Sequence, residues 1–322
     1  MNNLEPSTSP TPARITRHDD GRLVIRAHAK LNLGLRVFPA RPDGFHDLET
    51  WMLPISWHDT LTLLPGGPLQ LQITGRSVGV PTDLQKNLVG RAALKLAEAA
   101  NIPPTGTIQL HKVLPPGGGI GGGSADAGNV LVALNELWQL HFSHPQLQAI
   151  AAHIGSDVPF FVPAQPSLCT GRGEIMTPLL PAHPLFAVLI LPDRGLPTKD
   201  VYQAFDAGHQ HKNLPPTPWP ALAASTADQL NTLLLNDLEP PAFAIASWLA
   251  ELRQHAASII AQPVHLTGSG STLFTLASSS LAAAELQNRL TSQLPSTAIC
   301  IPVRIHRASL IPLISSAIHS KA

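Results

Sequence analysis

The first regular pattern in the chain is an alternation of hydrophobic and polar residues. In GRLVIRAHAKLNLGLRVF, over residues 21–38, hydrophobic side chains at positions 29, 31, 33, 35 and 37 recur with a period of two. This is the period of a β-strand, so Lys30 and Asn32 should point together to the other face. A turn at Pro42-Asp43-Gly44 ends the strand, and FHDLETWMLPISWHDTLTLL predicts a further one.

Two helical patterns follow. NLVGRAALKLAEAA, over residues 87–100, repeats hydrophobic residues every three or four positions and starts at Asn87, a plausible N-cap. TGTIQLHKVLP then predicts a strand that leads into a glycine-rich segment. After that segment, hydrophobic residues at 130, 131, 134, 137 and 138 predict a second helix. The order is therefore strand, glycine loop, helix.

The second half of the chain mixes strand and helix signals. PLFAVLIL suits a buried strand and is far shorter than the roughly 20 residues that span a bilayer. LLLNDLEPPAFAIASWLAELRQ is helical in pattern apart from a break at Pro240-Pro241, and PVHLTGSGSTLFTL places a glycine turn between two short apolar runs. We expect a disordered tail over 1–20, domains over 21–178 and 179–316, and a Pro/Ala-rich surface insertion over 209–229.

Composition excludes several classes of function. The chain has 322 residues, of which 44% are hydrophobic and 13% charged, so it can bury a large core. Its 21 basic and 21 acidic residues cancel, which predicts neither a nucleic-acid partner nor an anionic membrane. Two cysteines and the absence of an apolar leader fit a cytoplasmic protein. The 15 histidines are scattered, so we predict no metal held directly by side chains.

The glycine-rich segment PPGGGIGGGSADAGN is the main candidate for chemistry. Glycine loops at helix starts bind phosphate through backbone N–H groups and the helix dipole. The familiar ATPase loop continues with lysine, whereas Ser124 and Ala125 follow Gly123 here. The segment could be a flexible spacer, a different phosphate loop, or a loop whose cation comes from elsewhere in the chain.

A second candidate is Asp157 in HIGSDVPFF. A carboxylate among small and apolar residues is either a cap or a functional acid in a partly dry site. Lys30, taken alone, would be a solvated lysine on a strand. Phosphorylation of a hydroxyl needs a carboxylate, a cation and an amide-lined phosphate site, and the chain offers all three.

Three separated segments together resemble one known superfamily. AKLNLGLRVFPARPDGFHDLET, LPPGGGIGGGSADAGNVLVALNELW and HIGSDVPFFV are similar to motifs of the galactokinase, homoserine kinase, mevalonate kinase and phosphomevalonate kinase (GHMP) superfamily, and LTGSGS resembles its C-terminal glycine motif. The pairing of Lys-Leu-Asn-Leu with Asp-Gly-Phe-His is most similar to the 4-diphosphocytidyl-2-C-methyl-D-erythritol kinase family. The resemblance runs from about Lys30 to about Phe274.

The resemblance implies an α+β fold of two domains, with a ribosomal-protein-S5-like N-terminal domain, a ferredoxin-like C-terminal domain and the active site between them. It implies transfer of a phosphoryl group from ATP, with Mg²⁺, to the 2-hydroxyl of a cytidine diphosphate sugar alcohol in the methylerythritol phosphate pathway of isoprenoid precursor synthesis. The partners are thus small molecules.

Site residues follow from the same resemblance. Lys30 and Asp157 match the catalytic pair. Asn87 and Lys112 match positions near the adenosine. The phosphate loop is matched by Pro115, Pro116, Gly117, Gly118, Gly119, Ile120, Gly121, Gly122, Gly123, Ser124 and Ala125. The second substrate is matched by Asn32, Phe45, His46, Thr198, Tyr202, Gly268, Ser269 and Gly270.

Several of these positions have simpler explanations or depart from the pattern. Phe45 stands where tyrosine is common, and Ala125 where a second serine is frequent. Asp126 suits helix capping or, less well, a water-mediated metal contact. Tyr202, the one tyrosine of the chain, could pack in a core. The alternatives are another kinase of the superfamily, acting on homoserine or mevalonate, and a non-catalytic nucleotide sensor on the same fold.

Overall fold

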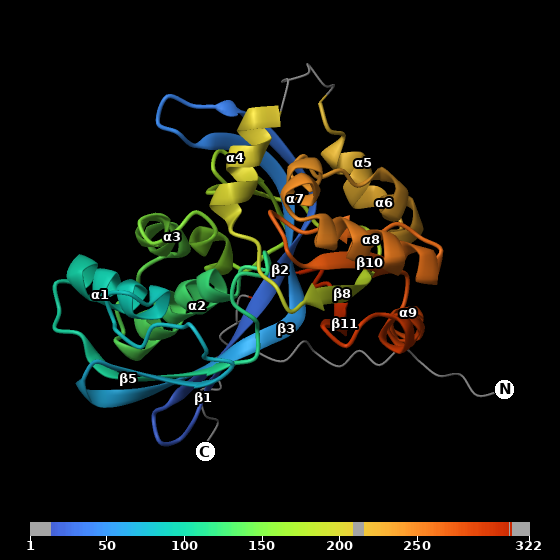
Figure 1. The fold of residues 1–322 in the computed structure, drawn as a ribbon. Helices are drawn as coiled ribbons and strands as arrows, with labels where there is room; N and C mark the ends of the chain where they lie inside the picture. The colour runs from blue at the N-terminus through green and yellow to red at the C-terminus, as the bar shows by residue number, and fades with distance from the viewer. Residues whose placement is uncertain (1–13, 209–215, 309, 311–322) are drawn as a thin grey trace.

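Two β-sheets and the helices packed on them make up the computed structural model, which describes residues 14–208, 216–308 and 310 (Figure 1). The first sheet has strand order β1-β2-β3-β5-β4, with β6 paired to β3 and β7 paired to β6. Its strands are β1 (Ile15–Arg17), β2 (Leu23–Ala40), β3 (His46–Pro68), β4 (Gln70–Gly75), β5 (Thr105–Lys112), β6 (Ser167–Thr170) and β7 (Ile175–Pro178).

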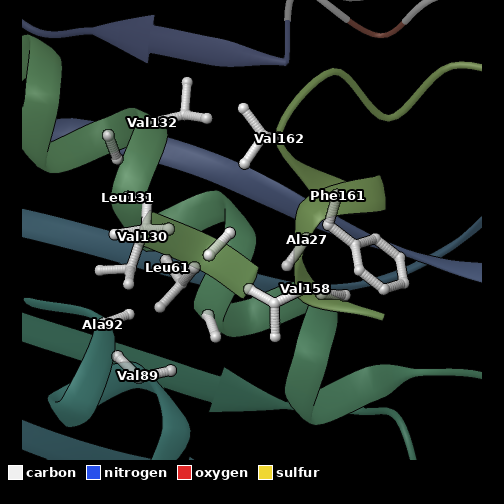
Figure 2. Packing of buried hydrophobic residues seen from close by; sticks show 14 of the residues in the cluster. Ala27, Leu61, Val89, Ala92, Val130, Leu131, Val132, Val158, Phe161 and Val162 are labelled. Carbon is white, nitrogen blue, oxygen red and sulfur yellow. The ribbon is translucent and has the colours of Figure 1, made fainter. Parts of the chain in front are cut away.

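Three α-helices lie together over one face of this sheet (Figure 1). They are α1 (Leu88–Ala100), α2 (Gly122–Leu137) and α3 (His144–Ala152). A short 3-10 helix, η1 (Val158–Phe161), packs against α2 directly after Asp157. In Figure 2, hydrophobic side chains of α2 meet those of η1, α1 and the strands, so one apolar core supports both the glycine loop and the Asp157 segment.

The second sheet has four antiparallel strands in the order β11-β8-β10-β9. These are β8 (Phe186–Pro192), β9 (His265–Leu266), β10 (Leu273–Ala277) and β11 (Ala298–Arg304). The helices of this half are α4 (Thr198–Gly208), α5 (Trp219–Ala224), α6 (Ala227–Leu233), α7 (Glu239–Ile245), α8 (Ser247–Ile260) and α9 (Ser280–Gln293). The predicted mixed α and β architecture is confirmed.

The two halves share a core. One buried hydrophobic cluster contains residues of β2 and β3 together with residues of β8, β10, β11, α5 and α6. The backbone also joins the halves, since Leu35 N–H donates to Leu235 O at 2.8 Å and Ile55 bridges Ile305. The predicted boundary at residue 178 coincides with the last residue of β7, and the predicted end at 316 lies outside the described residues.

The expected disordered tail is wrong for its last part. Residues 1–13 lie outside the described residues, but β1 pairs with β2, and Arg14 is only 4% exposed. The Arg14 guanidinium donates to Asn129 Oδ1 at 2.6 Å, to Val162 O at 2.7 Å and to Phe161 O. A buried guanidinium must have acceptors, and here backbone carbonyls provide them.

The expected surface insertion is also wrong where it is described. Residues 209–215 lie outside the described residues, whereas 219–229 fall largely in α5 and α6. Trp219 is buried, and its Nε1–H donates to Glu49 at 2.9 Å. The prolines suggested a loop, but Pro220 sits in the first turn of α5, where its missing N–H costs nothing.

The same reason corrects the break predicted at Pro240-Pro241. Both prolines stand in the first turn of α7, and the helical chain is interrupted at Ala246, between α7 and α8. Both cysteines are buried and free. Within the ranges that the structure describes, we find no helix with the length and apolar character needed to cross a membrane.

Candidate active site

A cleft of about 270 Å³ lies where the two halves meet. Strands β2 and β3, the glycine loop, Asp157, α4, Leu238 at the start of α7 and the C-terminal glycine turn all contribute to it. The residues that line it are Lys30, Asn32, Leu35, Leu48, Thr50, Met52, Pro115, Gly117, Gly118, Gly119, Gly121, Gly122, Gly123, Asp157, Thr198, Tyr202, Leu238, Gly268 and Ser269.

Lys30 is buried, with 3% exposure, so its interpretation as a solvated strand lysine is wrong. Its Nζ donates to Asn32 Oδ1 at 2.5 Å and to Gly119 O at 2.9 Å, and lies 3.6 Å from Asp157 Oδ2. The Asp157 side chain keeps 34% exposure and makes no capping hydrogen bond to η1. The structure thus pairs a buried cation with a partly exposed carboxylate at the cleft.

Asn32 is held from three sides. Its backbone N–H donates to Thr267 Oγ1 at 2.9 Å, its Nδ2 donates to Thr50 Oγ1 at 2.9 Å, and its Oδ1 accepts from Lys30. Thr50 in turn donates to Gly34 O at 2.7 Å. These bonds confirm that Lys30 and Asn32 share one face of β2, and they fix the amide orientation beside the ammonium.

Three glycines of the loop before α2 have a left-handed backbone conformation. Gly117, Gly119 and Gly121 have φ of 74°, 75° and 73°, a region that only glycine adopts easily. Helix α2 begins at Gly122, and its first N–H groups have no acceptor within the helix. Because Gly121, Gly122 and Gly123 line the cleft, this helix end can receive an anion there.

The C-terminal glycine turn packs directly on the loop. Thr272 N–H donates to Gly118 O at 3.2 Å, and a Cβ on Gly119 would lie 2.7 Å from Gly270 O. On the cleft side, Thr198 Oγ1 and Ser269 Oγ are hydrogen bonded at 2.8 Å. Gly270 therefore acts through the loop, while Gly268 and Ser269 face the cleft.

Some predicted loop residues do not line the cleft. Pro116 and Ser124 are absent from its lining, and the side chains of Ile120 and Ala125 are fully buried. Ala125 N–H donates to Gly121 O within the first turn of α2. Its methyl group belongs to the core beneath the helix, so a hydroxyl there would not reach the cleft in this structure.

The two residues expected near adenosine also stay outside the lining. Asn87 is the N-cap of α1, as its position in the sequence predicted, and accepts from Val89 N–H at 2.9 Å. Lys112 is 4% exposed and pairs with Asp59 and Asp126, so it is no surface charge. Asp126 is buried in this pair and does not cap α2, whose N-cap is Gly121.

The predicted aromatic residues lie in different environments. Tyr202 lines the cleft, and burial, with a contribution from the charge of Asp157, raises its pKa to about 12. His46 lies beside it, with ring centroids 5.3 Å apart, and its two nitrogens face Phe38 O at 2.7 Å and Asp206 Oδ1 at 3.2 Å. Phe45 is 49% exposed beneath the Arg172 guanidinium and does not line the cleft.

Several residues in or beside the cleft were not predicted from the sequence. Thr50 and Thr267, which orient Asn32, were not singled out, although Thr267 stands in the quoted glycine turn. The apolar wall was missed as well, because its residues look like ordinary strand and helix positions. It consists of Leu35, Leu48, Met52 and Leu238.

Two family descriptions match the chain, "GHMP kinases N terminal domain" over residues 87–164 and "GHMP kinases C terminal" over residues 220–296. Proteins named 4-diphosphocytidyl-2-C-methyl-D-erythritol kinase are similar over most of their length. That of Nocardia farcinica is 38% identical over 81% of this chain and 87% of its own, and that of Mycolicibacterium vanbaalenii is 36% identical over 88% and 90%.

Solved structures show the same relationship. A crystal structure of 4-(cytidine 5'-diphospho)-2C-methyl-D-erythritol kinase has a TM-score of 0.74 and 33% identity, covering 88% of this chain and 98% of its own. A homoserine kinase from Cytophaga hutchinsonii has a TM-score of 0.66 at 18% identity over 92% and 98%, which shows the shared fold alone. The fold, the motifs and these similarities agree: the chain belongs to the 4-diphosphocytidyl-2-C-methyl-D-erythritol kinase family of GHMP kinases.

Proposed function

We propose that this chain phosphorylates the 2-hydroxyl of 4-diphosphocytidyl-2-C-methyl-D-erythritol with ATP, a step on the methylerythritol phosphate route to isopentenyl diphosphate. The observation that carries the proposal is the pair Lys30–Asp157, 3.6 Å apart, in a cleft that also contains the N-terminus of α2. This is the set of groups that phosphoryl transfer to an alcohol requires. The names of the relatives supply the substrate.

Each group has a role in the transfer. The triphosphate lies against the glycine loop and the start of α2, whose N–H groups stabilise its negative charge. Asp157 accepts the proton of the attacking hydroxyl, and its partial exposure leaves room for that hydroxyl to approach. Lys30 stabilises the charge that develops on the phosphoryl oxygens.

The contacts of Lys30 explain how one cation serves both the glycine loop and Asp157. Its Nζ is held between Gly119 O of the loop and Asp157, and Asn32 restrains it from a third direction. A side chain that is already fixed loses little entropy when the substrates bind. The cation that the glycine loop lacks is therefore supplied by β2.

Magnesium fits this site as a companion of the nucleotide. Among the described residues there is no group of three or more histidines, cysteines or carboxylates that could hold a metal, and Asp157 is the one carboxylate that lines the cleft. The ion usually binds through one or two carboxylates and substrate phosphates. Bound in that way, the ion would neutralise phosphate charge, and Asp157 would be the side chain available to hold it.

The second substrate takes the side of the cleft formed by Asn32, Thr198, Tyr202 and Ser269. Asn32 is next to the methylerythritol hydroxyls, and the ring of Tyr202 offers a stacking face for cytosine. His46, adjacent to Tyr202, reads the cytosine edge once the substrate competes with Asp206 for its Nε2. Phe45 must leave Arg172 to complete a second stacking face.

The test is ADP release by the purified full-length chain with ATP and Mg²⁺. We expect turnover with 4-diphosphocytidyl-2-C-methyl-D-erythritol and at least about 100-fold lower kcat/KM with homoserine or mevalonate, because neither fills the cytosine side. A higher kcat/KM for either small alcohol would contradict the proposed substrate. ATP binding without turnover on any alcohol would favour the nucleotide sensor.

A further inference from the structure

A buried cluster of three charged side chains lies beneath the glycine loop, outside the cleft. Lys112, at the end of β5, donates to Asp126 Oδ2 at 2.7 Å and to Asp59 Oδ2. The side chains of Asp59, Lys112 and Asp126 are 0%, 4% and 2% exposed. Breaking a buried ion pair is strongly unfavourable, so these contacts hold their elements firmly together.

The cluster joins the two ends of the glycine loop. At the entrance, Asp59 Oδ1 accepts from Val113 N–H and, at 2.8 Å, from Leu114 N–H, the residues just before Pro115. At the exit, Asp126 is the fifth residue of α2, just past its first turn. Lys112 connects both carboxylates, and a Cβ on Gly122 would lie 3.7 Å from its Nζ.

The cluster holds two carboxyl groups but a single ammonium, and Asp126 Oδ1 is buried without a hydrogen-bond partner. Burial raises the pKa of Asp126 well above its usual value against the opposing charge of Lys112. A buried oxygen without a hydrogen-bond partner destabilises the fold. We expect such a cluster to be kept only where its contacts hold parts of the chain in a required position.

We propose that Asp59, Lys112 and Asp126 form a buried clamp that fixes the spacing between the entrance and the exit of the glycine loop. Lys112 is then a positioning residue for the bound phosphates, acting through the loop backbone, and makes no direct contact with adenosine. This inference rests on the proposed function for the presence of ATP in the loop.

The test uses variants that separate geometry from charge. Lys112→Met alone would leave two buried carboxylates unpaired and could prevent folding. The double variant Lys112→Met/Asp126→Asn removes the ammonium together with one of the two carboxyl groups, so the link to α2 is lost without leaving both carboxyl groups unpaired. Asp126→Asn alone removes that carboxyl group but keeps an oxygen that accepts from Lys112. Lys95→Met, on the exposed face of α1, is the matched control.

The expected result is selective for phosphate. In the folded double variant, the dissociation constant for ATP should rise at least about 10-fold, whereas the dissociation constant for adenosine should change less than about 3-fold, because adenosine does not use the loop. The KM for the second substrate should also stay within about 3-fold. Asp126→Asn should weaken ATP binding less than the double variant, and Lys95→Met should match the wild type.

Three results would overturn the clamp. Wild-type ATP affinity in a double variant with a cooperative melting transition would show that the loop keeps its shape unaided. An equal loss for ATP and adenosine would show direct contact with the nucleoside. An Asp126→Asn effect as large as that of the double variant would show that the Asp126 carboxyl matters by itself, without the link through Lys112. Nucleotide binding is measured without the second substrate, so these outcomes do not depend on whether the proposed second substrate is correct.

Discussion

Lys30 illustrates what a single residue contributes here, because strand alternation buries it on a face where three acceptor oxygens surround its Nζ. Lysine is rarely buried unless it is paired. Its partners come from the same strand, from the glycine loop and from the Asp157 segment. The position of this one charge is therefore set by three parts of the chain.

We expect Lys30→Met to bind ATP within about 3-fold of the wild type and to lose most of its turnover, because the charge acts mainly on the transition state. Asp157→Asn should lower kcat by about 10²–10⁴-fold, the usual value of general-base help. Calorimetric ATP titration and steady-state rates on the same samples check both, with Lys95→Met as control. Retained turnover in Lys30→Met would remove Lys30 from the transfer step.

At the same scale, the sequence predicts some residues far better than others. The shared face of Lys30 and Asn32 follows from the period of a strand, and Asn87 as a cap follows from the start of a helical pattern. The burial of Lys112 could not be predicted, since its partners Asp59 and Asp126 stand 53 and 14 residues away. Pairing of this kind depends on how the elements pack.

Among the elements, the glycine loop is constrained by contacts as well as by φ. Gly119 has φ of 75°, and its missing Cβ leaves room for the carbonyl oxygens of Gly270 and Thr267. Gly44 has a similar φ of 80° but no atom within 4 Å of the Cβ position. Alanine at Gly44 would therefore meet only the cost of a left-handed backbone, about 1–2 kcal/mol, whereas alanine at Gly119 would also meet a steric clash.

Gly119→Ala should therefore weaken ATP binding at least about 10-fold, since the loop must move away from the C-terminal turn, whereas Gly44→Ala should cost only about 1 kcal/mol of stability. ATP affinity and melting curves of both variants provide the measurement. Equal ATP affinities in the two variants would mean that the loop tolerates this displacement.

Strand β1 is held by Arg14, which donates to the carbonyl groups at the end of η1. Burial lowers the pKa of Arg14 to about 9, yet the guanidinium remains charged at neutral pH. Each carbonyl left unsatisfied costs about 1–3 kcal/mol, so we expect Arg14→Met to lower the free energy of unfolding by about 3 kcal/mol. Urea titration measures this loss.

Arg17→Met is the matched control, because Arg17 lies on the same strand and its 2.8 Å pair with Glu136 is exposed. Exposed pairs contribute about 0–1 kcal/mol. If both variants lost the same small amount, β1 would be dispensable for the Asp157 segment.

Element prediction succeeded where the period was long and regular, as in β2 and α2, and failed where proline was read as a loop signal. Residues 219–224 and 227–229 and the start of α7 are helical although they contain or follow prolines. Proline ends a helix but also begins one, and only packing distinguishes the two. Here the burial of Trp219 against Gly34 decides in favour of the helix.

For the whole molecule, buried histidines make stability depend on pH. His28, His58 and His306 gather where β2, β3 and the end of β11 meet, with the ring of His28 5.0 Å from His58 and 4.9 Å from His306. Burial lowers the pKa of His28 to about 3 and those of His306 and His265 to about 4, from the usual 6.5. These imidazole rings are therefore neutral in the folded protein at neutral pH.

Below pH 6.5 the unfolded chain takes up protons at these positions and the folded chain does not, until the pH approaches about 4. Stability should therefore be highest above pH 6.5 and fall as the pH drops, by about 1.4 kcal/mol per pH unit for each histidine. Urea midpoints from pH 7.5 to 4.5 test this. His306→Gln should flatten the dependence, and an unchanged slope would show that His306 does not contribute.

The contact between Gly119 and the turn at Gly270 also has a consequence for folding during synthesis. During synthesis the glycine loop leaves the ribosome long before residues 267–272, which complete its surroundings and fix Asn32 through Thr267. A nascent chain that ends before these residues has no finished nucleotide site, and part of the first sheet still lacks the side chains of β10 and β11 that cover it. Cellular ATP can therefore act as a folding ligand only on chains that have grown past residue 272.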